Sequence, residues 1–161
     1  LPTSRIFCNR AKIQDYIYGL LLQINLYFLQ FYYLQNTTDY SLGSTIISPE
    51  YRHVEGTLAD QLEVYLNGPT SSDLVSPFPD GTKLISIQFG NNKAEILLSQ
   101  EFSQLGGIEL SLACASLAKT CFTLTQATEL EIRAEKSLLD GTECITLTPT
   151  SLLLTDNSID K

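Results

Sequence analysis

The most constraining feature of this chain is a long stretch without charge near its start. No charged residue lies between Asp15 and Asp39, and eight of the fifteen aromatic residues fall within positions 16–40. A basic flank followed by about 20 apolar residues is typical of a membrane anchor. Amides such as Gln23 and Gln30 interrupt the run, however, and amides are costly in hydrocarbon. Because the second half is aromatic, we expect a buried strand or core helix entering the domain, with a spanning helix as the alternative.

The composition indicates one domain with an acidic surface. A length of 161 residues fits a single domain, and 43% hydrophobic with 17% charged residues excludes a disordered tail, a collagen-like repeat and a long coiled coil. The formal net charge is −8, and the part from residue 54 onward, with 6 cationic and 15 anionic residues, carries −9. Such a surface repels a polyanion, so we expect no nucleic-acid partner.

Beyond the uncharged stretch, the hydrophobic pattern predicts strands and helices in alternation. Thr57 and Asp60 have the spacing of a capping box at a helix start, and Gly68-Pro69 would end that helix. The expected elements are an extended segment at 46–54, a helix at 57–66, a loop at 70–81, strands at 83–89 and 93–98, a helix at 108–126, and strands at 130–135 and 143–147.

Two of these strands form a predicted hairpin. Ile85, Ile87 and Phe89 alternate with polar residues, which predicts one buried face, and Gly90-Asn91-Asn92 is typical of a hairpin turn. A second turn is expected at Asp140-Gly141.

This order predicts an α+β fold: a small two-layer sandwich with two helices on one face of a mixed, mostly antiparallel sheet. We expect the domain to comprise residues 29–155. Residues 1–28 would be a leader, an anchor or an extra segment, and residues 156–161 a polar tail.

The cysteines give little functional information. Cys114 and Cys121 are seven residues apart in the predicted helix, about 10 Å along its axis, too far for a disulfide, and we expect both to be buried as small hydrophobic residues. Cys8 and Cys144 could form a bridge in an oxidising compartment, although nothing in the sequence fixes their distance. No pair has the C-x-x-C spacing of a zinc or redox site.

A search for catalytic residues finds no convincing set. His53 is the only histidine and has no evident partner in the sequence, so a solvated or hydrogen-bonded strand histidine is expected. Glu129, Glu131 and Glu135 share strand parity and would line a solvated outer face, and Glu143 is a candidate by residue type alone. A small hydrolase using loop carboxylates is the weakest of the functional hypotheses.

Metal and nucleotide sites are equally unsupported by the sequence. Asp39, Asp73 and Asp80 lie in expected loops without the spacing of a calcium loop. Gly106-Gly107 precedes a helix and is expected to serve helix entry, with anion binding as the weaker alternative, and no nucleotide motif occurs. We therefore predict no catalytic, cofactor-binding or metal-ligating residues and no cofactor.

A group of turn and strand motifs resembles the GerMN domain family of spore-forming bacteria. The segments that carry the resemblance are Leu66-Asn67-Gly68-Pro69-Thr70, residues 76–84 (SPFPDGTKL) and residues 94–102 (AEILLSQEF). Tyr33-Leu34 and Arg52-His53-Val54 fall where that family has its first strands, and the match runs over about residues 29–147. Residues 1–28 have no place in the resemblance.

The resemblance implies a non-enzymatic cell-envelope domain in sporulation, germination or cell-wall processes. GerMN domains resemble ring-building modules, which implies protein–protein assembly or self-association as the mechanism and an extracytoplasmic location, membrane-anchored or secreted. The contact would be sought along the helix Thr57–Leu66 and the strands near Leu84–Leu98. The alternative is a peptidoglycan- or carbohydrate-binding module of a secreted or lipid-anchored protein. The acidic surface argues for contact with a membrane only through an anchor.

Overall fold

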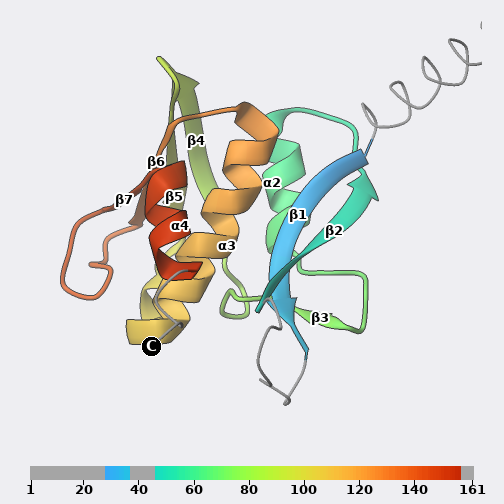
Figure 1. The fold of residues 1–161 in the computed structure, drawn as a ribbon. Coiled ribbons are helices and arrows are strands. Elements are labelled where there is room, and N and C mark those ends of the chain that lie inside the picture. Colours follow the sequence, from blue (N-terminus) through green and yellow to red (C-terminus); the bar gives the residue numbers. More distant parts are fainter. Residues whose placement is uncertain (1–27, 37–45, 157–161) are drawn as a thin grey trace, which may run out of the picture.

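Two β-sheets with helices between them make up the fold of the computed structural model, which describes residues 28–36 and 46–156 (Figure 1). The elements are β1 (Phe28–Gln35), β2 (Ile47–His53), α2 (Leu58–Leu66), β3 (Leu74–Val75), β4 (Leu84–Gly90), β5 (Lys93–Leu98), the 3₁₀ helix η1 (Gln100–Gln104), α3 (Gly107–Thr125), β6 (Glu129–Ala134), β7 (Ile145–Leu147) and α4 (Pro149–Asp156).

The predicted α+β class and the mixed, mostly antiparallel pairing are confirmed, but the described strands divide between two sheets. The first has the order β2-β1-β3 and the second the order β4-β5-β6-β7. Among the described strands only β5 and β6 pair in parallel, and α3 connects them, since a parallel pair needs a crossover. Figure 1 shows α2 and α3 between the two sheets.

The second half of the uncharged stretch is a strand, as the aromatic residues predict. β1 pairs antiparallel with β2 along its whole length, and Phe31 and Tyr33 are completely buried on its inner face. The alternative of one helix spanning the whole stretch is therefore wrong for residues 28–35. Residues 1–27 lie outside the described part of the chain.

Both helices contact the main chain of β1 at one residue, Tyr32. Tyr32 lies opposite Pro49 of β2, and its N–H and C=O point to the side where β1 has no paired strand. The N–H donates to Thr120 Oγ1 of α3 at 2.9 Å, and the C=O accepts a 2.7 Å hydrogen bond from the Tyr65 hydroxyl of α2. Side chains of two helices thus complete the strand edge, which explains why β1 does not join the second sheet.

Helix α2 begins and ends where its sequence signals predict. The Thr57 hydroxyl accepts a hydrogen bond from the Asp60 N–H, and the Asp60 carboxylate accepts one from the Thr57 N–H, so the capping box is complete. After the cap residue Asn67, Gly68 has φ +96°, a conformation that glycine adopts without strain.

The stretch at 70–81, expected to be loop throughout, contains the two-residue strand β3. Leu74 and Val75 pair antiparallel with the end of β1, opposite Gln35 and Leu34. A pairing this short has no periodicity from which the sequence could predict it.

Strand β4 departs from its predicted burial. Ile85 and Phe89, expected in the core, are 46% and 51% exposed, and only Ile87 of the three is half-buried. A bulge between Leu84 and Ser86 takes Ile85 out of the alternation. Phe89 lies next to the hairpin turn at Asn91-Asn92, and Figure 1 shows that this end of the hairpin extends past α2 and α3. The predicted turn is confirmed, with positive φ at both asparagines.

Aromatic side chains connect the first sheet to the helices. The Tyr65 ring stacks on Phe31 with centroids 5.7 Å apart, lies 4.9 Å from Tyr33, and meets Phe78 edge-on at 5.3 Å. Phe78 in turn lies 6.1 Å from Phe102 of η1. This chain of rings places Tyr65 at the centre of the core.

Helix α3 is the central helix and confirms the prediction for two of the cysteines. Cys114 and Cys121 are both buried and free, and burial raises the pKa of Cys114 to about 12. Among the described helices only α3 is long and apolar enough to span a membrane, a composition it shares with core helices. Helix α4 has no counterpart among the elements expected from the sequence.

The first prediction concerns the end of α2. Gly68→Val should lower the free energy of unfolding by about 1–2 kcal/mol, because a β-branched residue is strained at positive φ. Gly90→Val is the control, since Gly90 lies in open space without a positive φ. Equal stability losses for the two variants in chemical denaturation would contradict the left-handed conformation of Gly68.

The second prediction concerns the contact of α3 with β1. Thr120→Val should lower the free energy of unfolding by about 1–3 kcal/mol, because it leaves the partly buried N–H of Tyr32 without an acceptor. Thr123→Val is the matched control, since the exposed Thr123 hydroxyl donates to the Lys119 carbonyl of its own helix and contacts Tyr32 only at its side chain, not at its main chain. If Thr120→Val and Thr123→Val unfold at the same denaturant concentration, the Tyr32 contact does not support the fold.

Candidate functional site

The residues considered as catalytic candidates do not converge. His53 lies at the end of β2, half-exposed, with its ring edge-on to Phe28 and its Nε2 4.0 Å from Glu55 Oε1. Glu143, Asp73 and Asp80 are exposed, and Asp39 lies outside the described residues. In the described part of the chain no three His, Cys, Asp or Glu side chains gather as metal ligands would.

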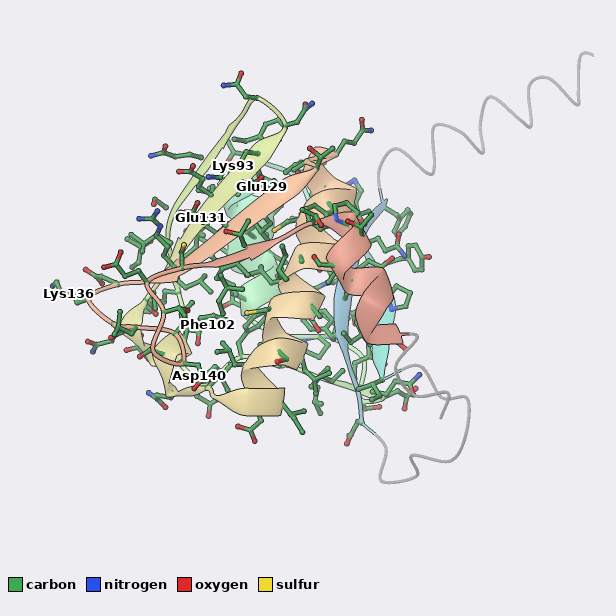
Figure 2. The ribbon with its side chains drawn as sticks, turned by 60° about the vertical axis from the view of Figure 1, so that its left-hand side comes forward. Lys93, Phe102, Glu129, Glu131, Lys136 and Asp140 are labelled. Atoms are coloured by element: carbon green, nitrogen blue, oxygen red, sulfur yellow. The ribbon has the colours of Figure 1, made fainter. Side chains whose placement is uncertain are left out.

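The glutamates of β6 differ from the expectation of a solvated row. Glu129 is half-exposed, and Glu135 lies just past the strand beside Lys136, but Glu131 is only 8% exposed. Figure 2 shows Glu129 and Glu131 with Lys93 on the same side of the second sheet, away from the helices. The prediction of a solvated side chain is therefore wrong for Glu131.

Ion pairs hold Glu131 in place on that sheet face. Lys93 Nζ lies 2.8 Å from Glu131 Oε2, 3.0 Å from Glu95 Oε1 and 3.6 Å from Glu129 Oε1, and Arg133 Nε donates to Glu131 Oε1 at 2.6 Å. The hydrogen bond from Lys93, and then that from Arg133, lowers the pKa of Glu131 below its ordinary value. Two cations and three carboxylates are thus joined across the parallel pair β5–β6, so each carboxylate of the cluster has a cationic partner and the cluster supports the strand register.

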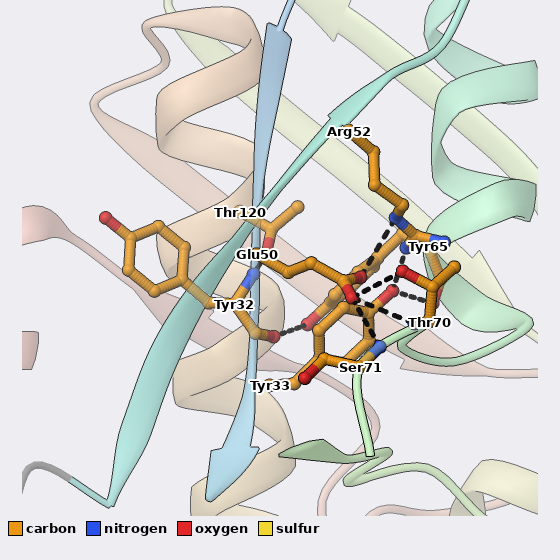
Figure 3. A network of polar contacts seen from close by, with 8 residues as sticks. All are labelled: Tyr32, Tyr33, Glu50, Arg52, Tyr65, Thr70, Ser71 and Thr120. Carbon is orange, nitrogen blue, oxygen red and sulfur yellow. Dashed lines mark hydrogen bonds and ion pairs between the residues drawn. The ribbon is translucent and has the colours of Figure 1, made fainter. Parts of the chain in front are cut away.

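A second polar network lies on the inner side of the first sheet, between β2 and the turn after α2 (Figure 3). Glu50 Oε1 accepts hydrogen bonds from the Thr70 N–H at 2.9 Å, the Thr70 hydroxyl at 2.7 Å and the Ser71 N–H at 2.8 Å. Glu50 Oε2 lies 3.1 Å from Arg52 Nε, and Arg52 also donates to the Tyr33 hydroxyl. The network ties β2 to the turn that follows α2.

The guanidinium of Arg52 also lies against two aromatic rings of β1. It lies over the Phe31 ring, 4.7 Å from the centroid, and 5.6 Å from the centroid of Tyr33. Burial raises the pKa of Tyr33 well above its ordinary value, despite the neighbouring charge of Arg52. Tyr33 therefore stays protonated and donates to the Tyr65 carbonyl at 2.8 Å.

Within the described part of the chain two surfaces stay open, and the first is the edge of β4, which has no paired strand there. Gly90 and Lys93 flank the two-residue turn as a hydrogen-bonded pair, so the main-chain groups of Ile87 and Phe89, in the non-bonded pairs, point away from β5. β4 contains no charged residue, and its Ile85 and Phe89 side chains are exposed. Charged residues usually protect such an edge, and here the bulge at Ile85 is the only protection within the strand itself.

The second open surface is the outer side of the first sheet, which we call the aromatic face. Its residues alternate with the buried ones and pair across the two strands: Phe28 with His53, Gln30 with Tyr51, and Leu34 with Ile47. Phe28 is 47% and Tyr51 61% exposed. Figure 3 shows the Tyr32 side chain on this side of β1, opposite Tyr33 and Tyr65.

An apolar groove of about 340 Å³ lies between α3, β7 and α4. Its lining includes Leu110 and Cys114 of α3, Ile145 of β7 and Leu152 of α4, together with Leu139. Asp140 is the charged residue of this lining, beside the hydroxyl groups of Ser111, Thr142 and Ser151.

The fold and these surfaces define a small α+β domain that presents a strand edge and a sheet face. Residues 25–140 match the sequence model of the Germane family, which is described as "Sporulation and spore germination". The chain therefore belongs to this family, and the resemblance drawn from its turn and strand motifs is confirmed. The division at residues 28/29 and 155/156 stays a prediction.

Solved GerMN domains share the fold. The first GerMN domain of the sporulation protein GerM from Bacillus subtilis superposes with a TM-score of 0.55 at 11% identity, covering 72% of this chain and 90% of that one. The tandem GerMN domains of the same protein give a TM-score of 0.53 at 15% identity, covering 72% of this chain. The present chain spans 43% of the length of the tandem structure. No curated protein matches the chain.

The third prediction concerns the Glu50 network. Burial alone would raise the pKa of Glu50, but the hydrogen bonds from Thr70 and Ser71 and the charge of Arg52 outweigh it and lower the pKa below the ordinary value of 4.5. Because the folded-state pKa is lowered, the ionised carboxylate stabilises the fold above pH 4.5, and this contribution is lost as the pH falls through the folded-state value.

Glu50→Gln should therefore lose about 2 kcal/mol of unfolding free energy at pH 7, and the gap to the parent protein should shrink below pH 4.5. Urea denaturation of both proteins between neutral and acid pH measures this gap. A gap that stays constant into acid would contradict the role of the ionised carboxylate.

Proposed function

We propose that this chain is a non-enzymatic domain of the cell envelope that acts in sporulation, germination or cell-wall processes through protein–protein assembly. Membership of the Germane family supports the process, and the open surfaces of the fold support the mechanism. The titratable side chains in the network of the first sheet and in the cluster on β5–β6 are used in structural ion pairs and hydrogen bonds, which favours interaction over catalysis.

The observation that carries the assembly proposal is the free edge of β4. Its outward main-chain groups at Ile87 and Phe89 can pair with a further strand, which is a common route to protein–protein recognition. The absence of charge within β4 removes the usual barrier to strand addition. A second copy of this chain is the partner we propose, since a neutral strand can pair antiparallel with itself about a twofold axis.

The fourth prediction tests this edge. Sedimentation velocity of the full chain over a hundredfold concentration range should show concentration-dependent association, and Phe89→Lys should weaken it by roughly tenfold. Ile108→Lys is the matched control, because Ile108 is 79% exposed but lies at the start of α3, away from β4.

Two results would contradict the proposal. A monomer at every concentration rules out self-assembly, and equal weakening by both substitutions shows that the contact is not the β4 edge. Co-sedimentation with purified cell wall then tests the alternative of a peptidoglycan- or carbohydrate-binding module.

A further inference from the structure

The groove between α3, β7 and α4 combines a buried apolar floor with an exposed polar rim. On the floor, Leu110, Cys114 and Leu139 are at most 4% exposed, and Ile145 and Leu147 of β7 form a half-buried side wall. The Cys114 thiol adds no charge, because burial raises its pKa to about 12. An apolar body with a few polar groups at its mouth is typical of small-molecule sites, which begin at roughly 300 Å³.

The hydroxyl groups of the rim have already committed their protons inside the chain. Ser111 donates to a carbonyl of its own helix at 2.9 Å, and Ser151 donates to the Thr148 carbonyl at 2.7 Å. Thr142 donates to the Leu139 carbonyl at 2.8 Å. A hydroxyl has one proton to donate and two lone pairs that accept. The rim therefore offers a ligand hydrogen-bond acceptors.

The carboxylate of Asp140 is held at the same rim by a tight turn, in the loop that follows β6 (Figure 2). Leu139 and Thr142 exchange main-chain hydrogen bonds of 2.8 and 2.9 Å, and Asp140 and Gly141 between them have φ +48° and +84°. Leu139 is completely buried, so the turn is anchored in the core. Within the described part of the chain the Asp140 carboxylate has neither an ion pair nor a hydrogen-bond partner.

This arrangement selects the chemistry of a ligand. A rim of acceptors with one carboxylate matches a group that donates hydrogen bonds and carries a positive charge. The net charge of −8 favours the approach of cations over that of anions. A neutral ligand would gain only the apolar floor, and an anion would be repelled by Asp140. An ammonium group on an aliphatic chain satisfies both parts of the groove.

We propose that this groove binds a small primary amine, with its aliphatic chain on the floor and its ammonium group at the rim beside Asp140. The ligand is a free molecule, because a narrow groove bounded by three elements admits a slender chain more readily than a folded partner. The inference goes beyond the proposed function and involves no residue of the β4 edge.

The experiment compares three ligands of equal chain length that differ only in the head group. The isotope-labelled full chain is titrated at neutral pH with hexylamine, hexanol and hexanoate, and the main-chain amide signals are followed by NMR. We expect the largest shifts at Ser111, Thr142 and Ser151, and hexylamine should bind about fivefold more tightly than hexanol. Hexanoate should bind more weakly than both. Butylamine should bind roughly tenfold more weakly than hexylamine, because it buries two methylene groups fewer.

Two substitutions separate the role of the rim from that of the floor. Asp140→Asn should reduce the affinity for hexylamine to that for hexanol, and asparagine tolerates the positive φ of this turn. Asp80→Asn is the matched control, since Asp80 is also exposed and precedes a glycine with positive φ but lies outside the groove. Ala115→Phe fills the groove and should abolish binding of both ligands.

Several results would overturn the proposal. Equal affinities for hexylamine and hexanoate, or an unchanged affinity for hexylamine in Asp140→Asn, exclude selection of an ammonium group. Shifts of similar size on the aromatic face or the β4 hairpin indicate unspecific adsorption. If Nα-acetyl-lysine methylamide binds as tightly as hexylamine, the occupant is a side chain of another protein and not a free amine. Phe89→Lys should leave amine binding unchanged, so this inference and the assembly proposal fail independently.

Discussion

The arrangement of the helices against the first sheet depends on the hydrogen bonds made by the main chain of Tyr32. A strand in the middle of a protein must satisfy its N–H and C=O groups on both edges. On the edge of β1 opposite β2, a paired strand is present only at the last two residues. Thr120 of α3 and the hydroxyl of Tyr65 of α2 satisfy the two groups of Tyr32 instead. Because the acceptor and donor come from different helices, this one residue fixes the position of both helices relative to the first sheet. Tyr65 also stacks against Phe31, so the hydrogen bond and the aromatic core support the same placement.

The Glu50 network extends this constraint to the turn after α2. Glu50 holds Thr70 and Ser71, and Arg52 of the same strand binds both Glu50 and Tyr33. Removing one partner of such a buried pair leaves the other charge buried and unpaired. The resulting loss of stability is larger than the free energy that the intact pair contributes. The second sheet uses the same chemistry on its open side, where Lys93 pairs with Glu95 of its own strand and with Glu131 of the neighbouring parallel strand. Charged residues in this domain thus hold strands in register, and the surfaces left open are largely uncharged.

Local signals in the sequence predicted the elements that local interactions determine. The capping box of Thr57 and Asp60, the end of α2 at Gly68 and the asparagine turn of the hairpin depend on residues a few positions apart, and all three are confirmed. Other features depend on distant partners. The exposure of Ile85 comes from a bulge against β5, β3 exists only because β1 ends beside it, and Glu131 is buried by Lys93 from another strand. The aromatic face could be recognised only once the register of β1 and β2 was known, because the sequence does not reveal which of its aromatic residues point outward.

The division of the uncharged stretch between β1 and the residues before it changes what that stretch can do. A single run of more than twenty residues would be long enough to span a membrane, but its second half forms β1, a strand that is buried on one face. The inner residues Phe31 and Tyr33 then belong to the core, and the alternate residues Phe28 and Tyr32 lie on the opposite side. The same alternation that builds the core therefore produces the aromatic face. The uncharged edge of β4 lies on the other side of α2 and α3 from this face, so the two open surfaces of the described domain point in different directions.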